Sequence, residues 1–256
     1  MKIGIISDIH EDGIRLTQAI RLLEKRDCDI LVCLGDMAGF DQRFYGYSYS
    51  RNLNYCLTVI RDNCRYVIPG NHDLFVLKKI PVWNHVFDFP GNWYMMSPAE
   101  RRNLSQGKVW NFEHDMPVSV DQPLVDWMDS LDEFFVLEED GLRILFTHSL
   151  FPDPMGMMTR KPYRHSDFEP HLSMLSEMNC DLGISGHLHP NGVFRIRRRD
   201  TIRGKFGHLE VGADVLQMVC PCIAESNQDN GFAILDTAQR TVEAIPLRTP
   251  NHPIFW

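Results

Sequence analysis

The chain has 256 residues, of which 44% are hydrophobic and 23% are charged, so it is long enough to bury a substantial core. Its formal net charge of −8 argues against a protein whose main work is to coat the nucleic-acid backbone, because such chains are basic overall. No apolar stretch has membrane-spanning length and no export signal is recognisable, so we expect a cytoplasmic protein without a membrane partner. The seven cysteines are odd in number and mostly lie in apolar patterns, as reduced core residues do.

The first seventy residues alternate strand-like and helix-like patterns, which predicts a parallel sheet. Apolar runs at 3–6, 30–34 and 65–68 have the length and composition of buried strands. Between them, apolar residues recur at helical spacing around 14–23 and 53–60. Each strand is followed by a short polar packet, and the carboxyl ends of parallel strands meet at one edge of a sheet. We therefore expect the packets to converge.

The segment from 74 to about 130 is rich in aromatic residues and proline, and it contains no such packet. The sequence Ser97-Pro98-Ala99-Glu100 predicts a helix start with a capping box, and a second helix is expected after Asp121, around 123–131. Aromatic residues in a helical insertion usually form a small core of their own. We interpret 74–130 as an insertion over the site, and as a candidate lid, within a single domain spanning 1–256.

The second half of the chain predicts a further sheet. An Asp140-Gly141 hairpin turn joins strands at 134–137 and 142–146. A helical pattern follows around 172–178, and then a short strand at 180–185. Runs at 193–196, 209–211, 216–219, 232–235 and 242–245 predict mostly antiparallel strands, which we expect to form a second sheet packed on the first.

The polar packets contain the residue types that bind metal ions. In chain order they are Asp8-Ile9-His10, Gly35-Asp36, Gly70-Asn71-His72-Asp73, Thr147-His148 and Gly186-His187-Leu188-His189. A two-metal hydrolase needs such oxygen and imidazole ligands, because they hold two ions about 3.5 to 4 Å apart around a shared carboxylate. A lone buried histidine is more often a core residue than a ligand, but the packets together indicate a two-metal hydrolase site.

In this order and at these strand ends, the packets resemble the motif set of the calcineurin-like metallophosphoesterases, most closely their compact bacterial and archaeal phosphodiesterase and phosphatase branch. The resemblance extends from Met1 to about Leu247. It implies a four-layer α/β/β/α sandwich of two mixed sheets flanked by helices. It also implies a dinuclear phosphoesterase that hydrolyses phosphomonoesters or phosphodiesters, of a small molecule or nucleotide, by attack of a metal-bridging hydroxide.

Carried over by position, the resemblance implies that the first metal ion is bound by Asp8, His10, Asp36 and His189. The second is bound by Asp36, Asn71, His148 and His187, so Asp36 is the bridge. Such a ligand set suits Mn, Fe, Zn, Ni or Co ions. The resemblance further implies that His72 contacts the phosphate and protonates the leaving alkoxide, and we expect Asp73 to orient its ring.

Two basic clusters lie outside the packets. Arg160, Lys161 and Arg164 follow His148 in the chain and are candidate substrate-binding residues, although a solvated loop explains them equally well. Arg195, Arg197 and Arg199 alternate along an expected strand, which suits a charged edge strand or, less often, a nucleic-acid track. The remaining histidines are expected at the surface or in loops: His85, His114, His165, His171, His208 and His252.

Three functions are compatible with these residues. The favoured one is hydrolysis of a small phosphorylated substrate or nucleotide. A nuclease or RNA-processing enzyme with the same metals is the first alternative, and a non-catalytic scaffold is the second. The segment Gly35-Asp36-Met37-Ala38-Gly39 lacks the arginine that follows this aspartate in protein serine/threonine phosphatases, which argues against a phosphoprotein substrate.

Overall fold

The computed structural model describes residues 1–162 and 164–249, and its strands form two mixed sheets of six strands each. The first sheet has the order β3-β2-β1-β11-β12-β9. Its members are β1 (Lys2–Ile6), β2 (Ile30–Cys33), β3 (Tyr66–Val67), β9 (Gly207–Glu210), β11 (Gly231–Asp236) and β12 (Thr241–Pro246). The first three strands run parallel to one another, and β11 pairs antiparallel with β1. The parallel half therefore brings three strand ends to one edge.

The second sheet has the order β4-β5-β6-β10-β7-β8. Its members are β4 (Phe134–Glu139), β5 (Leu142–Thr147), β6 (Leu182–Ser185), β7 (Val193–Arg197), β8 (Thr201–Lys205) and β10 (Val215–Val219). Strand β6 is parallel to both β5 and β10, whereas β4, β7 and β8 pair antiparallel with their neighbours. The expectation that all late strands belong to a second sheet is wrong, because β9, β11 and β12 extend the first sheet. Strand β8 was not expected.

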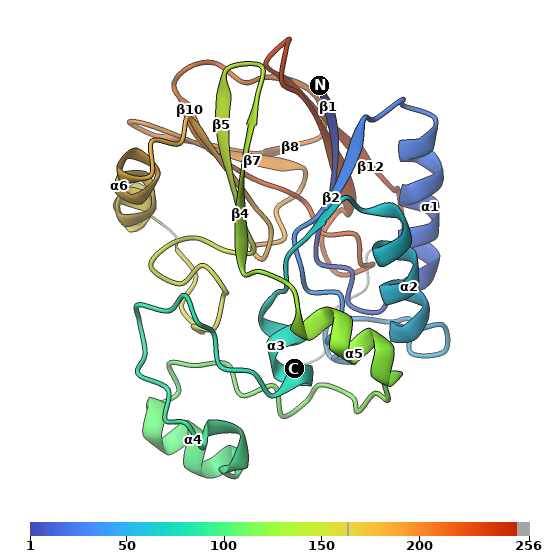
Figure 1. Ribbon diagram of the computed structural model, residues 1–256, viewed down its shortest axis with the longest axis vertical. Helices are drawn as coiled ribbons and strands as arrows, with labels where there is room; N and C mark the ends of the chain where they lie inside the picture. Colours follow the sequence, from blue (N-terminus) through green and yellow to red (C-terminus); the bar gives the residue numbers. More distant parts are fainter. Residues whose placement is uncertain (163, 250–256) are drawn as a thin grey trace.

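The sheets pack face to face, and helices cover both outer faces (Figure 1). Helices α1 (Gly13–Glu24) and α2 (Leu53–Asn63) lie on the first sheet, and α6 (Glu169–Glu177) lies on the second. Alternation along β1 explains the layering, since Ile3 and Ile5 enter the core between the sheets while Ile6 packs under α1 with Leu16. The expected four-layer α/β/β/α sandwich is confirmed.

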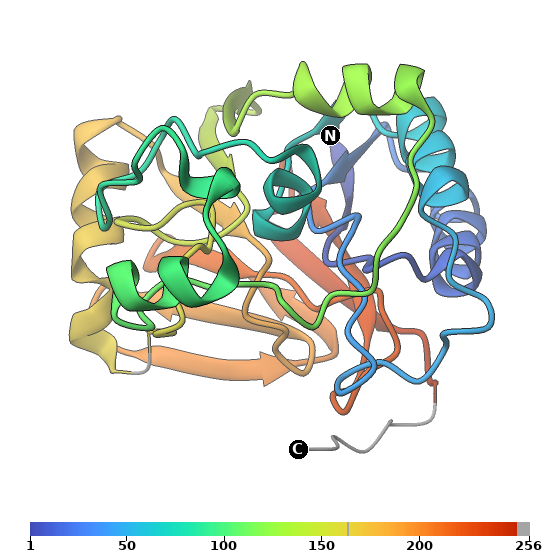
Figure 2. The ribbon, with the colours of Figure 1, turned by 90° about the horizontal axis from the view of Figure 1, so that it is seen from below.

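Three shorter helices lie at the carboxyl end of the parallel strands, the end seen in Figure 2. Helix α3 (Asn71–Leu77), which was not expected, begins at a polar packet. Helix α4 (Pro98–Ser105) has the expected capping box, because the Ser97 hydroxyl accepts from Glu100 N at 3.3 Å and the Glu100 carboxylate accepts from Ser97 N at 2.7 Å. Helix α5 (Gln122–Asp129) follows Asp121 as expected.

The aromatic residues between α3 and α5 mostly form a small core, as expected. Trp93, in the short 3-10 helix η1 (Trp93–Met95), is buried and packs edge-on against Phe87 and Phe89, with ring centroids 5.4 and 5.2 Å away. This core also includes Met155 and Met157 from the loop after β5, so the insertion and that loop fold against each other. A second 3-10 helix, η2 (165–168), precedes α6.

All seven cysteines are free thiols. Among residues 1–162 and 164–249, no helix is long and apolar enough to cross a membrane.

Candidate metal centre

The packet residues occupy strained backbone at the ends of β1, β2 and β6. A left-handed φ is uncommon for residues other than glycine, and it concentrates at functional sites where the surrounding fold enforces it. Five packet residues have such a φ: Asp8 (55°), His10 (46°), Asp36 (51°), His187 (64°) and His189 (49°). These sharp reversals turn the side chains towards one another instead of continuing the strands.

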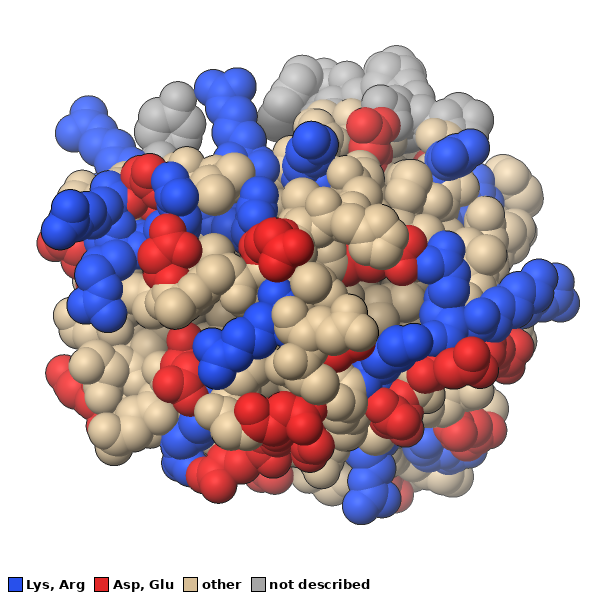
Figure 3. Space-filling model, turned by 90° about the horizontal axis from the view of Figure 1, so that it is seen from above, with Lys and Arg blue, Asp and Glu red and all other residues tan. Residues whose placement is uncertain are grey.

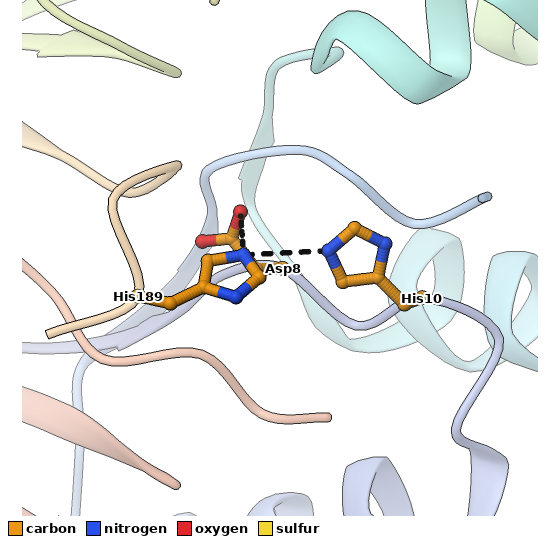
Figure 4. A group of neighbouring side chains, drawn as sticks. All are labelled: Asp8, His10 and His189. Atoms are coloured by element: carbon orange, nitrogen blue, oxygen red, sulfur yellow. Dashed lines mark hydrogen bonds and ion pairs between the residues drawn. The ribbon is translucent and has the colours of Figure 1, made fainter. Parts of the chain in front are cut away.

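One group of converging side chains consists of Asp8, His10 and His189 (Figure 4). Nε2 of His189 lies 3.1 Å from Oδ1 of Asp8 and 3.4 Å from Nε2 of His10. The Asp8 carboxylate is fixed from behind, since it accepts from the Ser7 hydroxyl at 2.6 Å and from His187 N at 3.0 Å. His10 Nδ1 donates to the carbonyl of Gly39 at 2.8 Å, which leaves Nε2 as a free electron-pair donor facing the group.

A second group consists of Asp36, His148 and His187. Nε2 of His148 lies 3.3 Å from Oδ2 of Asp36 and 3.1 Å from Oδ1 of Asn71. His148 Nδ1 donates to the carbonyl of Leu34 at 2.7 Å, so this imidazole is oriented in the same way as His10. Asn71 thus joins the group from the first turn of α3.

The His187 ring is packed against the backbone of the loop after β5. A Cβ at Gly156 would lie 2.6 Å from Cε1 and from Nδ1 of His187, so only glycine permits this approach. The residue also has a φ of +71°, a conformation that glycine adopts without strain. The loop is held in place by Asp153, whose carboxylate accepts from the backbone N–H groups of Met157 and Met158.

Asp36 lies between the two groups. Its Oδ2 is 3.3 Å from Nε2 of His148 and 3.9 Å from Nε2 of His10, so one carboxylate faces both sets of imidazoles. A third overlapping group contains His10, Asp36 and His72. The structure therefore brings together all seven residues that the sequence assigned to metal binding, and it divides them around Asp36.

The electrostatics of the centre fit positively charged metal ions. Burial alone would raise the pKa of Asp36, but His148 and His72 hold it well below its usual range. Burial lowers the pKa of His10 to about 4, and burial with nearby Lys161 keeps the pKa of His187 well below normal. Against the effect of burial, Asp36 raises the pKa of His148 to about 9, and Cys222 and Asp8 raise that of His189 to about 10, so metal binding at these two rings would displace a proton. In each of the three groups the ligand atoms lie within 4.8 Å of one another. Buried carboxylates with converging imidazoles suit borderline divalent ions.

The ring of His72 is held by Asp115 and not by Asp73, so the expected orienting role of Asp73 is wrong. Nδ1 of His72 lies 2.6 Å from Oδ2 of Asp115. The carboxylate of Asp73 points the other way and accepts from the backbone N–H groups of Met37, Ala38 and Gly70. Its role is to tie the packet after β2 to the start of α3. Asp115 lies in the insertion, far from any motif, and the sequence contained no signal for it.

His72 is surrounded by groups that favour its protonated form. Burial would lower its pKa, but Asp115 and Asp36 raise it to about 9. Its backbone N–H donates to Oδ1 of Asp36 at 3.0 Å, and Phe112 packs edge-on against its ring at 4.7 Å between centroids. Phe112 has a φ of 53°, which is unusual for a bulky residue. Such a conformation persists only where the surrounding structure enforces it.

Among the contacts of residues 1–162 and 164–249, one member of the first basic cluster touches a packet residue. Lys161 is exposed overall, but its Nζ donates to the carbonyl of His187 at 3.4 Å, and partial burial there lowers the pKa of the ammonium group. Arg160 is exposed and pairs with Asp167 at 3.4 Å. Arg164 is also exposed, and its backbone N–H donates to the same aspartate.

Two arginines of the second basic cluster already interact with neighbouring groups. Arg197 pairs with Asp200 at 2.5 Å and with Asp214 at 3.3 Å. Arg195 donates to the carbonyl of Glu210 at 3.1 Å, and Arg199 lies beyond the end of β7, contrary to expectation.

Of the remaining histidines, His171 is a buried core residue rather than a surface one, so that expectation is wrong. His252 lies outside the described residues.

The family of the chain follows from comparison with known proteins. The family model of calcineurin-like phosphoesterases matches residues 1–191. The chain therefore belongs to the calcineurin-like phosphoesterases, a family of phosphoester hydrolases that use divalent metal ions.

Individual proteins share part of the sequence or the fold. An uncharacterised protein of Methanocaldococcus jannaschii is 38% identical over 78 residues, which are 30% of this chain and only 28% of that protein. A metallophosphoesterase of Sphaerobacter thermophilus shares the fold with a TM-score of 0.63 at 15% identity, over 98% of this chain and 89% of that one. A hypothetical protein of Pyrococcus horikoshii does so with a TM-score of 0.60 at 11% identity, over 97% and 88%.

Proposed function

We propose that the protein is a dinuclear metal-dependent phosphohydrolase acting on a small phosphomonoester, phosphodiester or nucleotide. The observation that carries the proposal is the position of Asp36, whose Oδ2 faces His148 at 3.3 Å and His10 at 3.9 Å. A carboxylate between two imidazole groups is the arrangement that two ions with a shared ligand require.

Asp8, His10 and His189 with Asp36 would hold one ion, and His148, His187 and Asn71 with Asp36 would hold the other. We expect Mn, Fe, Zn, Ni or Co ions, since neutral imidazoles and carboxylates suit all of them. When bound, two such ions make hydroxide available near neutral pH and place positive charge against the phosphoryl group. The hydrogen bonds to Gly39 and Leu34 fix the position and tautomer of two of these ligands, His10 and His148.

His72 is the proposed general acid. An acid must be protonated at the working pH, and the carboxylates of Asp115 and Asp36 favour the imidazolium form. Nδ1 is engaged by Asp115, so Nε2 is the nitrogen that would give its proton to the leaving oxygen. The ring lies beside His10, with centroids 5.0 Å apart, which supports a position next to the ions.

Lys161 is the member of the first basic cluster that we propose for substrate binding. Its ammonium group is held beside the second group of ligands by the His187 carbonyl. There it would attract a phosphate oxygen. Arg160 and Arg164 interact with Asp167 instead of a packet residue, and we assign them a role only in the outer approach of anionic substrates.

The test is hydrolysis of p-nitrophenyl phosphate and of bis-p-nitrophenyl phosphate with added Mn²⁺. We expect turnover by the wild type and a loss of at least about 100-fold for Asp36→Asn and His187→Ala. His208→Ala is the matched control, because that imidazole is exposed on β9 and remote from the packets. Equal turnover of all four proteins would refute the metal assignment.

The nuclease alternative has less support. Arg195 and Arg197 already interact with Glu210, Asp200 and Asp214. On the face seen in Figure 3, which is the end of the molecule opposite the metal centre, Lys and Arg are interspersed with Asp and Glu. Cleavage of short single-stranded oligonucleotides that weakens on Arg197→Glu would favour it. The non-catalytic scaffold would be supported if the protein bound neither Mn²⁺ nor Zn²⁺ when each ion was supplied in excess.

A further inference from the structure

A buried ion pair lies beside the metal centre and has no place among its ligands. Glu11 follows His10 directly, has a side chain only 1% exposed, and forms an ion pair with Nε of Arg51 at 2.8 Å. The Arg51 side chain is itself only 13% exposed. Buried ion pairs add little net stability, because removing two charges from water is costly, so their positioning role is the more informative property.

The same guanidinium also holds the insertion. Nη2 of Arg51 donates to the carbonyl of Pro117 at 2.8 Å and to that of Met116 at 3.5 Å. The backbone N–H of Met116 donates to the carbonyl of Phe40 at 2.8 Å. Residues 116–117 are therefore fastened both to Arg51 and to the loop after β2. These residues directly follow Asp115, whose carboxylate contacts His72.

We propose that Arg51 is a positioning residue for His72: it fastens the segment 115–117 to the loop that carries His10, and so keeps the Asp115 carboxylate on the His72 ring. The inference rests on the proposed acid role of His72. Hydrogen bonds weaken steeply with distance and angle, so a small shift of 115–117 is enough to lose the contact of 2.6 Å. Arginine suits the task because its planar group presents donors in two directions, towards Glu11 and towards the carbonyls.

The kinetic test uses two esters that differ in their need for an acid. Phenolate is a poor leaving group and needs a proton on its oxygen as the P–O bond breaks, whereas p-nitrophenolate leaves readily without one. For Arg51→Met we expect kcat to fall about 10-fold or more with phenyl phosphate and less than about 3-fold with p-nitrophenyl phosphate. A merely structural defect would reduce both rates equally. Arg51→Lys keeps the charge facing Glu11 but has a single nitrogen, so we expect an intermediate loss.

Arg15→Met is the matched control. The Arg15 side chain is 15% exposed and forms an ion pair with Glu225. Among the described residues, it has no hydrogen bond or ion pair with the insertion. Its removal should reduce the two rates in the same proportion. In the Asp115→Asn background, Arg51→Met should cost less than about 2-fold further, because the contact that it protects is already lost. Independent, multiplying losses would overturn the proposal, as would equal losses on both esters.

Hydrogen exchange gives a readout that does not depend on activity. Arg51→Met should accelerate exchange of the Met116 amide in metal-free and in metal-loaded protein, whereas Arg15→Met should not. Unchanged exchange at Met116 would overturn the proposal that Arg51 holds the segment 115–117. A wild type that hydrolyses no ester would refute the proposed function instead, while the exchange data would still decide whether Arg51 holds the segment.

Discussion

Nδ1 of His72 lies 2.6 Å from Oδ2 of Asp115, although the two residues are 43 positions apart in the chain. The first stands at the start of α3, at the carboxyl end of the parallel strands, and the second stands in the insertion. The insertion therefore contributes a side chain to the surroundings of the centre. The proposed acid role of His72 can therefore be tested by changing a residue outside the motif-bearing segments.

Asp115→Asn should slow hydrolysis of phenyl phosphate about 10-fold or more, with a smaller effect on p-nitrophenyl phosphate. The amide keeps the shape of the carboxylate but lacks the charge that raises the pKa of His72, so the alkaline limb of the pH profile should move to lower pH. Asp88→Asn, which removes an exposed carboxylate of the same insertion, is the control. An unshifted limb together with equal losses on both esters would show that Asp115 does not act through His72.

His72→Asn should spare the metal ions while slowing turnover at least about 100-fold. His72 shares a group with His10 and Asp36, so it could also be read as a ligand. Its Nδ1 is engaged by Asp115, however, and the two groups that meet at Asp36 supply ligands without it. Elemental analysis of the loaded protein is the measurement. Loss of one ion per chain would assign His72 to the ligands instead.

Gly156→Ala should weaken metal binding at the group that contains His187. The new methyl would lie 2.6 Å from the ring, and a φ of +71° strains any residue with a Cβ. Gly141→Ala separates the two effects, because Gly141 has a φ of +72° and open space around it. Gly141→Ala should lose about 1 kcal/mol of unfolding free energy from backbone strain alone, and Gly156→Ala should lose more because of the clash. Only Gly156→Ala should need more metal for half-maximal activity. Identical metal dependence of the two variants would argue against contact with a ligand.

The sequence alone predicts the polar packets, but it does not predict the residues and elements that surround them. Asp8, Asp36 and His148 follow apolar runs whose strand character is locally encoded, and parallel strands must end at one edge. Asp115 is a single acidic residue in an irregular segment, and its contact depends on the path of the insertion. Strands β11 and β12 were assigned to the wrong sheet because alternation encodes which face is buried and not which strand is the neighbour. Helix α3 was missed because no apolar period announces its seven residues.

Stability should fall on acidification through His171. Its Nδ1 accepts from the backbone N–H of Phe151 at 3.0 Å and its Nε2 donates to Gln217 at 2.7 Å, so a second ring proton would face a donor. Burial lowers its pKa to about 4, against 6.5 in the unfolded chain. Below pH 6.5 the unfolded chain therefore binds a proton that the folded protein does not, and stability is lost as the pH falls towards 4.

Urea unfolding of the metal-free protein at pH 7 and pH 5 measures this loss. The contribution of His171 should be about 2 kcal/mol between these values, and His171→Gln should show a pH dependence smaller by that amount. His208→Gln removes an exposed histidine and should retain the full dependence of the wild type. If His171→Gln retains it too, the buried ring does not control the acid limb.

The most direct test of the dinuclear centre is a titration of metal-depleted protein with Mn²⁺, following hydrolysis of p-nitrophenyl phosphate. Because Asp36 faces the ligands of both groups, activity should be absent without metal, reach its plateau at two equivalents, and stay near zero for Asp36→Asn at any equivalent. A plateau at one equivalent, or turnover that persists in the metal-depleted protein, would contradict it.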